Sequence, residues 1–235
     1  MILSATALIL SVWLGGLATL FLKRRTIDIR VPLVFAGSFL FSVTIIHIVP
    51  ELFAQTDHPH EIGLWVLGGF FFQRLLEYYS RGVEHGHAHS QDNLSNANQF
   101  SILLALFIHS FSEGALLTHE SPFHEQHESY SLLLGIVVHK APAAFALMVI
   151  LINQKSKWIQ LAIFSLASPI GLILSTTVAL SPAIMTALVA VVCGSFLHIS
   201  TTIFVEANPQ HEYGWKQTMV SLTGAAVAIL SDYLF

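Results

Sequence analysis

FIHSFSEG (107–114) and VVHKAPAAF (137–145) are the two stretches around which the rest of the chain can be placed. Each lies near the middle of an apolar segment, 100–118 for the first and 130–152 for the second. They put two histidines, a glutamate and a lysine at the depth where the hydrocarbon of a bilayer is expected. An ionised side chain at the centre of a membrane helix costs about 2.5–3.5 kcal/mol on insertion scales. Titratable residues at this depth therefore indicate a functional site.

The composition is typical of a polytopic membrane protein. Of the 235 residues, 54% are hydrophobic and 10% are charged, and the mean hydropathy is +0.69, whereas soluble domains carry about 25% charged residues. A membrane-spanning helix needs about 20 apolar residues. The eight segments of this length are 1–22, 31–53, 62–82, 98–119, 128–152, 158–179, 182–205 and 216–234. We therefore expect one all-α transmembrane domain over residues 1–235, embedded in the lipid bilayer, with no room for a soluble domain.

Charge in the connectors predicts the orientation in the membrane. Basic residues lie in or at the edge of the connectors after the first, third, fifth and seventh segments: Lys23, Arg24, Arg25, Arg30, Arg81, Lys155, Lys157 and Lys216. The connectors in between contain no Lys or Arg, so the positive-inside rule places both termini of this bundle on the extracytoplasmic side. Basic residues follow segment 1–22 rather than precede it, and we expect it to be a retained spanning helix. Arg74 is expected to snorkel inward or to pair with Glu77.

The connector at about 83–97 is predicted to be a His-rich cytoplasmic loop. His85, His87 and His89 alternate in it. Such a tract can hold borderline divalent metal ions loosely. The alternative is a polar loop in which the histidines are incidental.

The strongest candidate for a metal site joins the two central segments. His109 and Glu113 are four residues apart, so their side chains share one helix face, and His139 on the next segment can complete the set. Neutral imidazole and carboxylate suit zinc and its first-row neighbours, whereas Mg²⁺ or Ca²⁺ would favour oxygen ligands alone. The alternative for each histidine is a structural hydrogen bond.

Two helix-weakening residues lie beside these candidates. Gly114 follows Glu113 directly, and Pro142 removes one backbone donor close to His139. Weakened helices at membrane depth are tolerated where they line a cavity or a binding site. An ordinary packing kink remains the alternative.

These motifs resemble the ZIP family of zinc transporters. The family has a motif of the form H-N-x-x-D/E-G in its fourth helix and one near H-E-x-P-E in its fifth, and this chain has HSFSEG at 109–114 and HKAPA at 139–143. The HKAPAAF run is closest to the Golgi-type branch. The resemblance implies eight helices with extracytoplasmic termini, a His-rich loop after the third helix, and a homodimer. It implies Zn²⁺ as the transported substrate, with Fe²⁺, Mn²⁺ or Cd²⁺ as alternatives.

The chain departs from the pattern of the dinuclear members of that family. Where they place the ligands of a second metal, this chain has Ser110, Lys140, Ala143 and Ser168. No carboxylate remains at these positions. We therefore expect a mononuclear site in which the ammonium group of Lys140 replaces the second metal.

Two further pairs are candidates for the path of the ion. His47 and Glu51 lie one helical turn apart near the outer end of segment 31–53, where Pro50 is expected to break the helix, and they could form an access or relay site. His198 near mid-membrane and Glu206 near the inner surface could line the exit path. Capping of the helix end by the first pair, and packing by the second, are the alternatives.

The sequence thus favours a divalent metal transporter that moves zinc toward the cytoplasm. A membrane-embedded zinc metalloenzyme and a metal-responsive receptor are the alternatives, because a site of two histidines and one glutamate with an open position also suits catalytic zinc. We expect no enzyme, since no H-E-x-x-H motif is present, and no nucleic-acid partner. The expected location is a multi-pass position in a membrane, which is the inner membrane if the source is prokaryotic.

Overall fold

The computed structural model describes residues 1–21, 30–54, 56–83, 95–117, 128–178, 181–206 and 214–234, and none of these residues forms a strand. The helices are α1 (Ile2–Phe21), α2 (Arg30–Val43), η1 (Thr44–Ile48), α3 (Val49–Ala54), α4 (Pro59–Ser80), α5 (Asn96–Leu116), α6 (Glu128–Ile150), α7 (Lys157–Thr177), α8 (Pro182–Glu206) and α9 (Trp215–Leu234). Because α2, η1 and α3 follow one another without a break, the described residues form eight long helical segments. The prediction of an all-α protein with eight helices is confirmed.

Six of these segments are long and apolar enough to cross a membrane, judged from the described residues. They are α1, the continuous helix Arg30–Ala54, and the helices α5, α6, α7 and α8. The other two, α4 and α9, have 22 and 20 residues, which gives each about 30 Å of helix at 1.5 Å per residue. They are more polar, and α4 carries Gln73, Arg74 and Glu77 in its second half. The chain is a multi-pass integral membrane protein.

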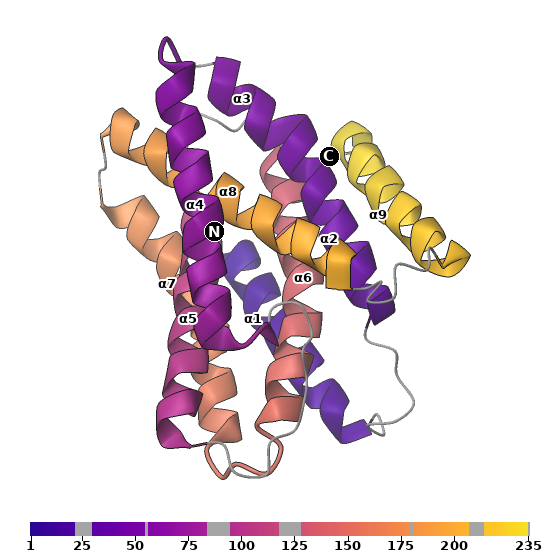
Figure 1. Cartoon of the computed structure of the whole chain (residues 1–235). Helices are drawn as coiled ribbons and strands as arrows, with labels where there is room; N and C mark the ends of the chain where they lie inside the picture. The colour runs from indigo at the N-terminus through magenta and orange to yellow at the C-terminus, as the bar shows by residue number, and fades with distance from the viewer. Residues whose placement is uncertain are drawn as a thin grey trace.

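The helices pack mainly in four pairs: α5 on α7, α1 on α6, α4 on α8, and α2 on α9. Contacts between α1 and α7 join the first two pairs, and contacts between α2 and α8 join the other two. The bundle therefore consists of a first group (α1, α5, α6, α7) and a second group (α2 with η1 and α3, α4, α8, α9), which meet where α2 touches α6 and α4 touches α5. Figure 1 shows α9 at one edge of the bundle beside α2, and α4 in front of α8.

Glycines allow the backbones of α5 and α7 to touch. A Cβ added at Gly114 would lie 1.9 Å from the carbonyl oxygen of Ser168, and one added at Gly171 would lie 2.1 Å from the carbonyl oxygen of Phe111. Neither position can hold a side chain unless the helices move apart. Membrane helices use small residues in this way because close packing replaces the hydrophobic effect between them. The helix that carries His109 and Glu113 is thus held firmly against α7.

The helix from Arg30 to Ala54 widens rather than breaks before Pro50. Residues Thr44–Ile48 form the π-helix η1, in which the Val49 N–H donates to the carbonyl oxygen of Thr44, and α3 then continues through Pro50 to Ala54. The predicted break at Pro50 is therefore wrong. Proline has no N–H to give to the preceding turn, and a wider turn accommodates this loss without ending the helix. Single π-turns of this kind are frequent near functional sites.

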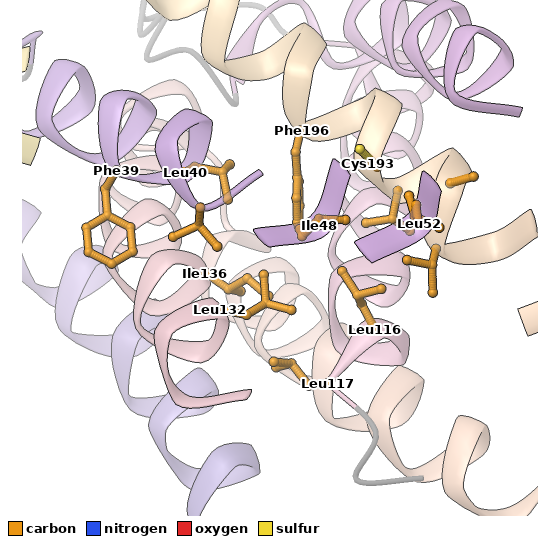
Figure 2. Close-up of a cluster of buried hydrophobic side chains, with 14 of the residues drawn as sticks. Phe39, Leu40, Ile48, Leu52, Leu116, Leu117, Leu132, Ile136, Cys193 and Phe196 are labelled. Atoms are coloured by element: carbon orange, nitrogen blue, oxygen red, sulfur yellow. The ribbon is translucent and has the colours of Figure 1, made fainter. Parts of the chain in front are cut away.

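Two large clusters of buried apolar side chains lie in the described interior, and a smaller third one joins Leu33 and Val34 of α2 to Ile199 and Ile203 of α8. The Phe196 cluster includes Leu8, Phe39, Leu40, Val43, Ile48, Leu52, Leu116, Leu117, Leu132, Ile136, Cys193 and Phe196. Figure 2 shows its side chains from α8, η1, α3, α5 and α6 pointing into one space. The Phe164 cluster includes Val12, Val83, Ile102, Leu106, Ala144, Leu147, Leu161 and Phe164.

The residues between these clusters are the titratable ones of the two central helices. On α5, Leu106 belongs to the Phe164 cluster and Leu116 to the Phe196 cluster, with His109 and Glu113 between them. On α6 the order is reversed, because this helix runs in the opposite direction: Ile136 comes before His139, and Ala144 follows it. The candidate site therefore has packed apolar side chains both above and below it along the two helices.

Candidate metal site

Three metal-binding side chains from α5 and α6 meet in the interior. The ligand atoms of His109, Glu113 and His139 all lie within 4.8 Å of one another, and within the described ranges this is the one group of three or more His, Cys, Asp or Glu side chains with this geometry. The Nε2 atom of His109 lies 3.1 Å from Oε1 of Glu113. The exposed fractions of the three side chains are 5%, 1% and 1%. The backbones of α5 and α6 pack mainly on other helices, α7 and α1 respectively. The side chains of His109, Glu113 and His139 therefore make the link between α5 and α6.

Several polar atoms of this group are poorly satisfied in the part of the chain that the structure describes. Both ring nitrogens of His139 have no hydrogen bond, and Nε2 of His109 and Oε1 of Glu113 have only the 3.1 Å contact with each other. A buried polar atom without a partner is costly and needs an explanation. A divalent cation bound by two imidazole nitrogens and one carboxylate oxygen would provide it, and this donor set is one that zinc uses. The His109 and His139 rings are perpendicular, at 89°, with centroids 6.0 Å apart.

Lys140 lies on the other side of Glu113. Its Nζ is 2.5 Å from Oε2 of Glu113 and also donates to Oγ of Ser110. The same Nζ is 5.5 Å from the centre of the Phe164 ring, and the side chain is 2% exposed. The lysine thus has an anionic acceptor, a hydroxyl acceptor and an aromatic face, which together compensate for burial of its charge.

Ser110 and Ser168 link this lysine to α7. Ser168 donates from Oγ to the carbonyl oxygen of Ser110 at 2.5 Å, and the two hydroxyl oxygens are 3.0 Å apart. Because the Ser168 hydrogen is already used, Ser110 donates to Ser168. The structure therefore brings together three of the four positions at which the sequence departs from the dinuclear pattern, and the fourth, Ala143, is buried on α6 and offers no ligand.

A comparison with protein families finds one that covers most of the chain. The family model described as "ZIP Zinc transporter" matches residues 82–232, which is more than half of the chain and includes every residue of the candidate site.

The chain belongs to the ZIP zinc transporter family.

Similar curated proteins carry the same family name. The ZIP9 zinc transporter of Xenopus tropicalis is 28% identical over 174 residues, which cover 64% of this chain and 55% of the relative. That of Micropogonias undulatus is 27% identical over 168 residues, or 62% of this chain and 52% of the relative. Zinc transporter ZIP9-A of Xenopus laevis is 28% identical over 178 residues, or 64% and 57%. This ZIP chain spans about half the length of the curated relatives it matches, and the resemblance inferred from its motifs is confirmed.

The other predicted residues of this ZIP chain lie apart from the ligand group. His47 belongs to the π-helix η1 and Glu51 to α3, and both are half-buried. They are on the second group of helices, and the structure does not bring them into the cluster around His109. His85, His87 and His89 lie outside the described residues, and for Glu206 the structure describes only its place at the end of α8.

His198 has a partner that the sequence did not identify. Its Nε2 lies 2.6 Å from Oε2 of Glu77 on α4, and its ring meets the edge of Phe70 at a centroid distance of 4.8 Å. From the sequence alone, Glu77 was expected only as a partner for Arg74. Gln73, one turn before Glu77, is completely buried, and its amide atoms have no hydrogen bond among the described residues. The signal in the sequence for this polar face was the spacing of Gln73 and Glu77, which are four residues apart and so share one face of α4.

Proposed function

We propose that this ZIP chain transports divalent metal ions, with zinc as the main substrate, through a mononuclear site formed by His109, Glu113 and His139. The observation that supports the proposal is the convergence of buried ligand atoms from two helices, including both ring nitrogens of His139, which make no hydrogen bond among the described residues. Two observations support a mononuclear site: Lys140 stands at a sequence position where the dinuclear members that the chain resembles have an acidic ligand, and its ammonium group lies against Glu113. The direction of transport is toward the cytoplasm.

The surroundings of the site suit a carrier of small ions. Apolar side chains of the Phe196 cluster and of the Phe164 cluster lie on either side of it along α5 and α6. An ion can leave this position only if one of the clusters opens, and opening one at a time would prevent a continuous leak. A metalloenzyme would instead need a path for a larger substrate and a product. Fe²⁺, Mn²⁺ and Cd²⁺ are further candidate substrates.

The proposal also includes the path of the ion, the orientation of the chain and its oligomeric state. His47 and Glu51 serve as an access or relay site, His198 and Glu206 line the exit path, and the His-rich loop at about 83–97 receives the ion. The chain acts as a single transmembrane domain with extracytoplasmic termini, forms a homodimer, and resides in the inner membrane if it is prokaryotic.

Zinc uptake into proteoliposomes tests the proposal. His109→Ala and His139→Ala should each reduce the flux strongly, because each removes one of three ligands. His60→Ala, which changes an exposed histidine at the start of α4, is the matched control and should retain the flux. Near-normal saturable uptake by the His109→Ala, His139→Ala double variant would contradict the site, and absence of flux in the wild type would favour a receptor or an enzyme.

A further inference from the structure

The two carboxylate oxygens of Glu113 have different neighbours. Oε2 lies 2.5 Å from Nζ of Lys140. Oε1 lies on the side of the histidines, 3.1 Å from Nε2 of His109, and makes no hydrogen bond among the described residues. Only one oxygen of this carboxylate is therefore turned toward the space in which an ion would bind.

This asymmetry limits the number of protein ligands. A carboxylate can bind a metal ion through one oxygen or through both. With Oε2 held by Lys140, the site offers Oε1 of Glu113 and one nitrogen from each histidine, which makes three donors. Zinc is satisfied by three protein ligands and one further position in a tetrahedral arrangement. Mn²⁺ prefers octahedral sites that are rich in oxygen.

We infer that Lys140 determines metal specificity by holding Glu113 in a one-oxygen binding mode, which favours four-coordinate zinc over six-coordinate manganese. The inference rests on the transport site proposed above and adds the reason for its selectivity. In this role Lys140 is a positioning residue, because it acts on the metal through Glu113.

The neighbours of Lys140 support this role. Its ammonium group also donates to Ser110, and Ser110 is in turn bonded to Ser168 on α7. The backbones of α5 and α7 touch at Gly114 and Gly171, so this support is rigid. The hydroxyl of Ser110 is engaged by both neighbours, and Ala143 supplies no oxygen from its side chain. Within the described residues, no second carboxylate joins the group.

Cobalt provides a measurement that does not depend on transport. Purified protein is loaded with Co²⁺, which absorbs strongly in the visible range when four-coordinate and weakly when six-coordinate. The wild type should give the strong spectrum. Lys140→Met should weaken it, because the freed Oε2 can add to the coordination shell. Competition binding should also show the preference for Zn²⁺ over Mn²⁺ reduced by about tenfold, the lower end of the range for changes to groups that orient metal ligands.

Lys157→Met is the matched control, since Lys157 at the start of α7 donates to the carbonyl oxygen of Ile152 and lies outside the site. It should leave the spectrum and the metal preference unchanged. A weak, six-coordinate spectrum in the wild type would overturn the inference without any variant, even if Lys140→Met fails to fold. An unchanged spectrum and preference in folded Lys140→Met would overturn it as well.

Cobalt binding by His109→Ala separates a failure of the proposed metal site from a failure of the role of Lys140. If His109→Ala binds Co²⁺ as the wild type does, the site itself is misassigned. If His109→Ala loses Co²⁺ while the wild-type spectrum is six-coordinate, the site stands and only the role of Lys140 is wrong.

Discussion

Lys140 is among the largest side chains that the described structure buries completely. A lysine in this position is stable only if its charge is compensated, because removal of an ammonium group from water costs several kcal/mol even after relaxation. Glu113 supplies the opposite charge, Ser110 a further acceptor, and Phe164 an aromatic face. These contacts make the lysine and the glutamate mutually dependent for the stability of the fold.

A double-mutant comparison tests this dependence. Glu113→Ala leaves Lys140 buried without its anion and should lower the free energy of unfolding by about 3–5 kcal/mol, as when one partner of a buried ion pair is removed. Combining Glu113→Ala with Lys140→Met removes both charges and should recover much of the loss. Unfolding in detergent of the wild type and both variants provides the measurement. If the double variant is as unstable as Glu113→Ala alone, Lys140 does not depend on Glu113.

At the residue scale, the sequence predicts which side chains meet in the candidate site, but not the buried polar contacts that lie apart from it. His109 and Glu113 follow from helical spacing, and Lys140 from its place in a motif. The contact between Glu77 and His198 could not be predicted, because the two residues are 121 positions apart and belong to helices whose relative rotation no local pattern specifies. Spacing within one helix is regular, whereas register between helices depends on packing.

Among the elements, the pair α5 and α7 is the one on which the geometry of the site depends. Gly171 lies against the backbone of Phe111, and Phe111 stands between His109 and Glu113 in the sequence. A wider separation of the two helices would shift both ligands relative to α6.

Gly171→Ala should therefore reduce stability and zinc uptake together. The new Cβ would start 2.1 Å from the carbonyl oxygen of Phe111, and overpacking of this kind costs about 1–3 kcal/mol. Gly68→Ala on α4 is the matched control, because a Cβ there meets nothing within 4 Å and alanine is the better helix former. Unfolding in detergent and proteoliposome uptake measure the two effects. Equal behaviour of the two variants would show that the close contact is not needed.

The sequence also predicts where the helices lie better than it predicts irregular turns within them. Long apolar segments identify the helices, since about 20 such residues are needed to cross a bilayer. It does not predict the π-helix at Thr44–Ile48, because a proline at position 50 is compatible with a break, a kink or a wider turn. The structure shows the wider turn, and the choice depends on how the neighbouring helices pack.

At the scale of the whole molecule, the bundle divides into two groups of helices with the candidate site inside the first. The sequence predicts the number of helices and the membrane location. It does not predict this division, because the pairing of α4 with α8 and of α5 with α7 depends on contacts between distant segments. The His-rich loop connects α4 of the second group to α5 of the first.

Deletion of residues 84–92 should leave zinc transport measurable. All three proposed ligands are on α5 and α6, so the proposed site does not need the loop to hold the ion. We expect a change in apparent affinity or in the rate of release to the cytoplasmic side, because alternating histidines bind metal loosely. Initial rates of uptake at several zinc concentrations measure this. Loss of all flux from a correctly folded deletion variant would instead make the loop an essential part of the path.

The contact between Lys140 and Glu113 also bears on one step of the proposed transport cycle, in which the protein returns without cargo. A carrier has to complete its cycle after the metal has left, and an unpaired carboxylate would then remain in the low-dielectric interior. With the ammonium group against Oε2, the unloaded site contains one positive and one negative charge that compensate each other. The unloaded protein therefore avoids the cost of a lone buried anion. The proposed uptake cycle therefore needs no second ion to be carried back to neutralise Glu113.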